Sequence, residues 1–202
     1  MSLQKLVLFI DGQNFYKGAR RAFFPGTAVH HTDGQITPMK MGKLLISKCP
    51  DSSNIVLQEV RVYTGRPDAT REPITYAAHM KQCAAWNRDG VTVIHRALRY
   101  PANWPVEKPQ EKGIDVALAI DFVAFGLDKK FDIGVIASTD TDLNPAVEYV
   151  YNKCSENCRV NVVTWKSQTA NSRLYIKGSK IWCHWLDRYD YESVADVTDY
   201  SV

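Results

Sequence analysis

The fold is decided by one stretch of sequence, Phe131-Asp132-Ile133-Gly134-Val135-Ile136-Ala137-Ser138-Thr139-Asp140-Thr141-Asp142-Leu143-Asn144-Pro145. Its apolar run, residues 133–137, is typical of a strand that is covered on both faces in a parallel sheet. Two aspartates follow, and then Asn144 suits the N-cap and Pro145 the first position of a helix. Asp140 and Asp142 therefore lie at the carboxyl end of a central strand, where open α/β sheets bind ligands.

The same order of strand, acid and helix recurs from the start of the chain. The apolar run Leu6–Ile10 ends in Asp11-Gly12-Gln13-Asn14, and a helix to about Arg21 follows. The other expected elements are helices over 38–48, 73–88, 112–127, 145–153 and 168–175 and strands over 54–64, 91–98, 159–165 and 180–185. This alternation predicts an α/β fold, a three-layer α/β/α sandwich with a mainly parallel, Rossmann-like central sheet.

The length of 202 residues predicts a single domain, 1–202. Loops are expected near 22–37 and 99–111, and a polar C-terminal tail near 187–202. The first loop holds His30 and His31, whose side chains should diverge as on an extended chain, so we expect a solvated loop rather than a metal-binding pair.

Composition narrows the class of protein. No run approaches the roughly 18 apolar residues of a membrane helix, and the first strand leads into Asp11 with no cleavage region, so we expect a cytoplasmic protein without membrane contact. The 5 cysteines are an odd number without a paired framework, which favours reduced thiols, with a zinc site at Cys154 and Cys158 as the alternative. A net charge of +3 permits a polyanionic partner.

Parallel topology gathers polar residues at one edge of the sheet, because every strand-to-helix junction lies there. Four aspartates and one amide are expected at this edge: Asp11, Asn14, Asp115, Asp140 and Asp142. Two unit charges ~4 Å apart repel by about 4 kcal/mol at an effective dielectric of about 20. A hard divalent cation such as Mg²⁺ would offset this repulsion, and the chemistry then implied is attack of an activated water on a phosphodiester.

Each aspartate also has a structural interpretation, because Asp at such a junction is often a plain helix cap. For Asp142, a role as a helix cap or as support for the metal ligands is as well founded as direct metal ligation. For Asp11, capping explains less, because Gly12 and Asn14 already suit the turn. Asp121 follows Asp115 by six positions and points to another side of the helix, which predicts a structural role such as pairing with a base.

Basic and aromatic residues near this edge favour a nucleic-acid partner. The basic candidates for phosphate contacts are Lys17, Arg20, Arg66, Arg71, Lys108, Lys112 and Lys166, with Ser167 beside the last. The aromatic candidates for stacking on unpaired bases are Tyr16, Phe23, Phe24, Tyr100 and Trp104. For each of them, plain solvation or packing into the core is the alternative.

Three motifs together resemble the NYN domains of the PIN-like ribonuclease superfamily. They are Phe9-Ile10-Asp11-Gly12-Gln13-Asn14-Phe15, Lys112-Gly113-Ile114-Asp115-Val116-Ala117-Leu118-Ala119-Ile120-Asp121 and Ala137-Ser138-Thr139-Asp140-Thr141-Asp142-Leu143. The resemblance spans roughly residues 5 to 165, with Thr139 in place of the usual Gly and Leu143 in place of Phe. It implies a PIN-like sheet, an RNA substrate and a Mg²⁺ or Mn²⁺ ion held by Asp11, Asp115 and Asp140, with Asn14 and Asp142 in support.

The sequence thus predicts a metal-dependent ribonuclease that binds RNA, single-stranded or structured, through Arg66, Lys112, Lys166 and Ser167. A non-catalytic RNA-binding regulatory module on the same fold is the alternative. A phosphohydrolase of the haloacid dehalogenase type would need a second Asp where Gln13 stands, and a dinucleotide-binding protein would need a Gly-rich turn there. The helix over 112–127 is apolar around most of its circumference, which predicts burial in the sandwich or a homodimer contact.

Overall fold

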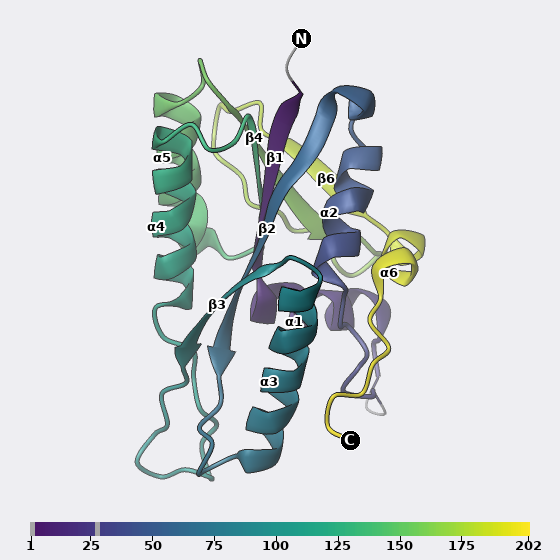
Figure 1. Cartoon of the computed structure of the whole chain (residues 1–202), viewed down its shortest axis with the longest axis vertical. Helices are drawn as coiled ribbons and strands as arrows, with labels where there is room; N and C mark the ends of the chain where they lie inside the picture. Colours follow the sequence, from purple (N-terminus) through teal and green to yellow (C-terminus); the bar gives the residue numbers. More distant parts are fainter. Residues whose placement is uncertain (1–2, 27–28) are drawn as a thin grey trace.

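The structure is a computed structural model that describes residues 3–26 and 29–202; residues 1–2 and 27–28, the latter within the expected loop 22–37, lie outside it. A six-stranded sheet with the order β3-β2-β1-β4-β5-β6 forms its centre (Figure 1). Neighbouring strands are all parallel, as expected. The strands are β1 (Gln4–Asp11), β2 (Ile55–Arg66), β3 (Thr92–Ala97), β4 (Ile133–Ala137), β5 (Arg159–Trp165) and β6 (Trp182–Leu186).

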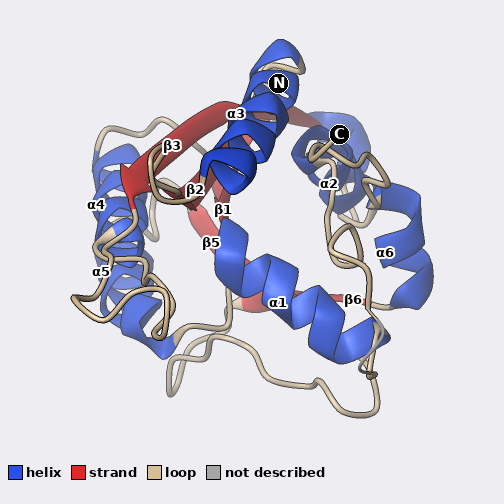
Figure 2. Cartoon of the chain, turned by 90° about the horizontal axis from the view of Figure 1, so that it is seen from below, coloured by secondary structure: helices blue, strands red, loops and turns tan. Residues whose placement is uncertain are grey.

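Helices cover both faces of the sheet and complete the predicted α/β sandwich. They are α1 (Gly12–Phe23), α2 (Pro38–Ser47), α3 (Pro73–Arg88), α4 (Ile114–Leu127), α5 (Asn144–Lys153) and α6 (Arg188–Val194). Figure 2 shows α4 and α5 on one side of the sheet and α2 and α6 on the other. Helix α5 begins one residue earlier than expected, so that Leu143 rather than Asn144 is its N-cap.

Strand β1 divides the apolar core into two halves. Successive side chains of a strand point to opposite faces, so Leu6, Leu8 and Ile10 pack on the side of α1 and α2, whereas Val7 and Phe9 pack on the side of α4 and α5. All five side chains are buried. The continuous apolar run is therefore explained by a central strand that is covered on both faces.

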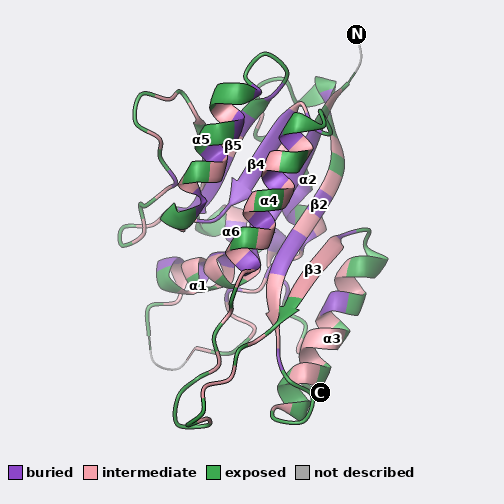
Figure 3. Cartoon of the chain, turned by 90° about the vertical axis from the view of Figure 1, so that its left-hand side faces the viewer, coloured by how far each residue is buried: buried purple, intermediate pink, exposed green. Residues whose placement is uncertain are grey.

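Helix α4 is only half buried, which corrects the prediction that it is covered around most of its circumference (Figure 3). Leu118 and Phe122 face the sheet with no exposed surface, but Val116 is 54% exposed and Ile120 62% exposed on the outer face. The homodimer contact through this helix stays a prediction. Asp121 pairs with a base as expected, since its carboxylate lies 2.7 Å from the Arg61 guanidinium.

The C-terminal part of the chain corrects two further predictions. Residues 168–175 are irregular rather than helical, because the Ser167 hydroxyl accepts hydrogen bonds from the backbone N–H groups of Thr169 and Ala170 and so forms a local turn instead. The polar tail expected over 187–202 contains α6, whose capping box joins Asp187 and Asp190. Its buried face anchors the segment to the core through Tyr191 and Val194.

All five cysteines are free, and Cys49 alone among them is only half-buried. No helix in the described ranges has the length and apolar character needed to cross a membrane. The two expected loops are held by specific contacts. Arg20 binds the backbone carbonyls of His30 and Asp33 in the first, and a backbone bridge between Arg99 and Gln110 closes the second.

Candidate active site

Asp11 ends β1 and caps α1. Its side chain is buried, and its Oδ1 accepts a hydrogen bond of 3.1 Å from the backbone N–H of Asn14. The expectation that capping explains Asp11 poorly is therefore wrong, because Asp11 itself is the N-cap. Asn14 in turn uses its side-chain oxygen to accept hydrogen bonds from the backbone N–H and the hydroxyl of Thr139, at 3.0 and 3.1 Å. The start of α1 is thus tied to the turn after β4.

The turn after β4 places two aspartates beside Asp11. Ser138 donates its hydroxyl hydrogen to Asp11 Oδ2 across 3.0 Å and accepts a bond of 3.1 Å from the backbone N–H of Asp140. Asp140 caps the next turn, because its Oδ1 accepts from the backbone N–H of Asp142 at 3.1 Å. Asp142 is exposed. Thr139 fits the position that glycine usually holds because its φ angle is not positive.

Asp115 reaches the site from the first turn of α4. The residue before this helix, Gly113, has a φ of 73°, a left-handed conformation that favours glycine. Asp115 itself is half-buried, and the preceding Lys112 is exposed. The helix start therefore directs one acid toward the sheet edge and leaves one base beside it in solvent.

The electrostatics of Asp11 indicate that three of the acids are close to one another. Burial is the main cause that raises the pKa of Asp11; hydrogen bonds from Asn14 and Ser138 lower it, and the negative charges of Asp140 and Asp115 raise it further. In the part of the chain that the structure describes, none of these three aspartates has an ion-pair partner. The described part of the site thus gathers one buried and two half-buried acids without an ion-pair partner.

This donor set fits a hard cation. All its ligand atoms are oxygens, which Mg²⁺ and Mn²⁺ prefer. Within the described residues, the carboxylate oxygens of Asp11, Asp115 and Asp140 do not all lie within 4.8 Å of one another. Mg²⁺ keeps several water ligands, so that some of these carboxylates could reach it through water.

A fifth carboxylate, Glu111, lies at the site although nothing in the sequence pattern indicated it. It ends the loop over 99–111 and accepts a hydrogen bond from the backbone N–H of Gly65. The approach is close, since a Cβ atom on Gly65 would lie 2.7 Å from Glu111 Cγ. The pKa of Glu111 is raised, mainly by burial and further by the charges of Asp11 and Asp115, whereas Lys17 opposes the shift. Lys17 is thereby a basic candidate whose charge reaches this carboxylate.

A cleft of about 390 Å³ adjoins the acids between α1, β2, α3 and the C-terminal segment. Its lining includes Gly12, Gln13, Tyr16, His79, Trp86 and Glu111, so that it opens beside the residue that follows Asp11. Burial, followed by the nearby charges of His95 and Arg66, lowers the pKa of His79 to about 4. The wall of the cleft therefore carries the imidazole of His79, which is neutral at neutral pH.

The remaining RNA-binding candidates are spread along the carboxyl edge. Arg66 ends β2 on the side of α3, and Lys166 follows β5 with its ammonium 5.7 Å from the centre of the Trp185 ring. Ser167 shapes the turn described above. The aromatic candidates Phe23 and Phe24 are half-buried and pack on Tyr191. The prediction that these two rings serve for base stacking is therefore not supported by their position.

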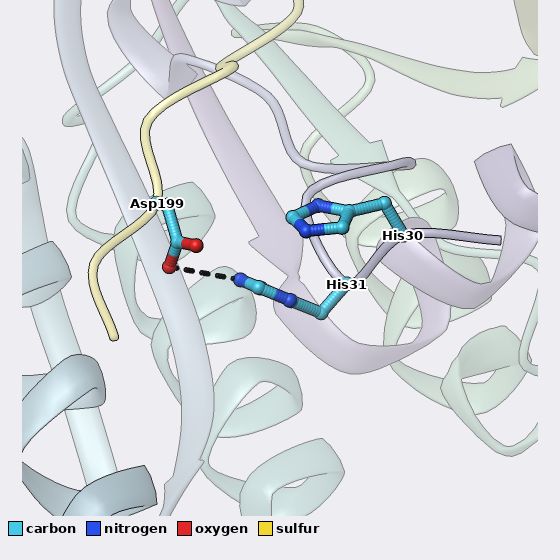
Figure 4. A group of neighbouring side chains, drawn as sticks. All are labelled: His30, His31 and Asp199. Atoms are coloured by element: carbon cyan, nitrogen blue, oxygen red, sulfur yellow. Dashed lines mark hydrogen bonds and ion pairs between the residues drawn. The ribbon is translucent and has the colours of Figure 1, made fainter. Parts of the chain in front are cut away.

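The two histidines of the first loop do not diverge as expected (Figure 4). Their ring centroids lie 4.1 Å apart because the loop turns at this point instead of running extended. The Nε2 atom of His31 lies 2.9 Å from an oxygen of Asp199. Among the described residues, these three form the group whose metal-ligating atoms all lie within 4.8 Å of one another.

Comparison with known proteins gives a family and a fold. The family model described as "NYN domain" matches residues 5–176. Among solved structures, a protein of unknown function from Vibrio parahaemolyticus aligns with a TM-score of 0.51 and 16% identity over 87% of this chain and 94% of that one. No match was found among curated proteins. The structural likeness supports the α/β fold alone.

Proposed function

The chain belongs to the NYN domain family, and from this premise we propose that it is a divalent-metal-dependent ribonuclease that hydrolyses RNA phosphodiester bonds. One observation carries the proposal. The buried carboxylate of Asp11 lies within the electrostatic reach of Asp140 and Asp115, and among the described residues none of the three has an ion-pair partner. Keeping such charges together costs free energy unless a cation offsets it.

In this proposal Asp11, Asp115 and Asp140 hold Mg²⁺ or Mn²⁺, and Asn14 and Asp142 support them. When bound, such a cation polarises a phosphoryl oxygen and eases deprotonation of the attacking water. The contribution of the protein is to hold the acidic side chains in place. Asn14 and Ser138 join the ends of β1 and β4, which supports the positions of Asp11 and Asp140 before a cation binds.

We propose that the RNA strand follows the carboxyl edge of the sheet. Lys112 and Lys166 are exposed and suited to phosphate contacts, and the half-buried Arg66 and Ser167 would add to them. A nucleotide next to the scissile phosphate would enter the cleft between α1 and α3, whose aromatic lining suits an unpaired base. A cytoplasmic location agrees with the five unpaired thiols.

The test combines metal binding with cleavage. Wild type, Asp11→Asn, Asp140→Asn and the exposed control Asp128→Asn are titrated with Mg²⁺ and Mn²⁺ by calorimetry and incubated with labelled single-stranded RNA. We expect cleavage only with metal, its loss by at least about 100-fold in the two site variants, and wild-type behaviour of the control. Wild-type cleavage by Asp140→Asn would refute the assignment.

Two other outcomes separate the remaining functions. Metal binding without cleavage of the test RNA would indicate an enzyme restricted to its own substrate. Salt-dependent RNA binding without metal binding would instead identify a regulatory RNA-binding module, in which the aspartates serve only as caps.

A further inference from the structure

We propose that His30, His31 and Asp199 form a second metal site, which binds a transition-metal dication such as Zn²⁺ and is separate from the acidic edge. Two imidazoles and one carboxylate are ligands that Zn²⁺ favours, whereas the acidic edge offers only oxygen. Catalytic and other open zinc sites commonly use three protein ligands and leave the fourth position to water. The two sites should therefore differ in the metal that they prefer.

The geometry is close to that of a bound site. The ligand atoms of the three residues lie within 4.8 Å of one another, and His31 Nε2 is already 2.9 Å from Asp199 Oδ1. Ligands of a tetrahedral zinc ion are roughly 3.3 Å apart, given bonds of about 2.0–2.1 Å. Rotation of partly exposed side chains is enough to close the difference, since the side chain of His31 is 49% exposed and that of Asp199 32% exposed.

Hydrogen bonds leave the right nitrogen of His30 available. Its Nδ1 atom lies 2.8 Å from the hydroxyl of Thr32 and 3.4 Å from the backbone nitrogen of Thr32, which leaves Nε2 for a metal. A partner of this kind on the other ring nitrogen orients many metal-binding histidines. For His31, the metal would take the place of the proton that Nε2 shares with Asp199 (Figure 4).

The backbone of the histidine loop is held in place before any metal binds. The hydroxyl of Tyr16 donates to the carbonyl of His31 at 2.8 Å, and Arg20 donates to the carbonyl of His30 at 2.7 Å. The side chain of Asp33 accepts from the backbone N–H of His30 at 2.8 Å. Two residues of α1 and one of the loop thus fix the spacing of the imidazoles.

A metal at this point would join the C-terminal segment to the wall of the cleft. Asp199 lies on that segment, and its neighbours Tyr200 and Ser201 line the cleft together with His31. Beyond them, the Lys81 ammonium on α3 donates to the carbonyl of Val202 at 2.7 Å. The segment therefore runs from the histidine loop to α3, and the proposed metal would hold one side of the cleft in place.

The experiment titrates the full chain with Zn²⁺ and, for spectroscopy, with Co²⁺. The variants are His31→Ala, Asp199→Asn, Asp140→Asn and the control Asp128→Asn. With Mg²⁺ in excess to occupy the acidic edge, we expect one equivalent of Zn²⁺ to bind to wild type, Asp140→Asn and the control, and binding to weaken at least about tenfold in His31→Ala and Asp199→Asn. Excess Mg²⁺ should not displace the zinc.

Several results would overturn the proposal. Unchanged zinc affinity in His31→Ala would show that the imidazole of His31 does not bind the metal. Loss of zinc binding in Asp140→Asn would show that the zinc binds at the acidic edge. A thiolate-to-cobalt absorption band would show that a cysteine binds the metal. Circular dichroism of each variant confirms that it is folded, which is expected because the altered side chains are at the surface.

Discussion

The hydroxyl of Ser138 lies 3.0 Å from the carboxylate of Asp11 and joins the ends of two adjacent parallel strands, β1 and β4. The same hydroxyl accepts from the backbone of Asp140. One serine thereby sets the distance between two of the acids proposed to hold the cation. The arrangement of these two acids therefore depends on an uncharged side chain that lies within the third motif.

Ser138→Ala should damage this arrangement. Loss of the two hydrogen bonds of a buried hydroxyl is expected to lower the free energy of unfolding by about 1 kcal/mol, and cleavage should slow because Asp140 is less well placed. Urea denaturation and a cleavage assay measure the two effects. Ser193→Ala, which removes an exposed hydroxyl, is the control. Equal behaviour of the two variants would mean that Ser138 does not organise the site.

Asp11→Asn should stabilise the fold at neutral pH. Burial raises the pKa of Asp11 in the folded state, so the folded protein holds this proton more tightly than the unfolded chain does. The resulting loss of stability is absent below the usual pKa of 3.8 and complete above the raised value. Asn keeps the N-cap, so we expect a gain of about 1 kcal/mol at pH 7.

Denaturation between pH 3.5 and 8, without divalent metal, tests the sign of this effect. The advantage of Asp11→Asn should shrink as the pH falls toward about 4. Asp11→Ala serves for comparison, because it also removes the charge but loses the cap, at a cost of about 1 kcal/mol. A constant difference between wild type and Asp11→Asn at every pH would contradict the raised pKa.

Glu111→Gln should weaken cation binding without loosening its loop. The new amide oxygen still accepts from the backbone of Gly65, but the charge next to Asp11 and Asp115 is lost. We expect the affinity for Mn²⁺ to fall about tenfold, as for other charged neighbours of metal ligands. Calorimetry measures it, and limited proteolysis of the loop over 99–111 shows whether the loop is intact. Unchanged affinity would leave Glu111 with a structural role alone.

Asp121→Asn should affect stability and leave catalysis unchanged. The Asp121 carboxylate accepts hydrogen bonds from Arg61 and from the hydroxyl of Tyr63, at 2.7 and 2.8 Å. Replacing it is expected to cost about 1–3 kcal/mol, since the half-buried guanidinium loses a charged partner. In the exposed pair Arg188–Glu192, Glu192→Gln should cost less than about 0.5 kcal/mol. A cleavage rate per folded molecule below that of wild type would assign Asp121 to the site.

Tyr191→Phe should show that the C-terminal helix belongs to the folded core. The hydroxyl of Tyr191 accepts a buried hydrogen bond of 2.8 Å from the backbone N–H of Gly34. Its removal leaves that N–H without this partner and should cost about 1–2 kcal/mol. Tyr189→Phe changes a residue that is 81% exposed and should have no measurable effect. Equal melting temperatures for the two variants would contradict this account.

The sequence by itself determined the sheet, its parallel strands and the edge at which the acids lie. Apolar runs such as Ile133–Ala137 need cover on both faces, and the acids directly after them must end at one edge of a parallel sheet. These are local patterns, and local patterns decide which element forms. The helix expected over 168–175 is the exception, because a serine turn competed with it. Helix α6 was missed although its capping box could have indicated it.

Only the tertiary structure decided which side chains meet at that edge. Ser138 and Asp11 are 127 positions apart, and His31 and Asp199 are 168 apart. Glu111 reaches the acids from a loop whose path no periodicity predicts, and Phe23 is half-buried because it packs on Tyr191. The physical reason is that hydrogen bonding and close packing depend on distances of a few ångströms between distant segments. Such distances are set by the packing of the whole chain, which no local pattern contains.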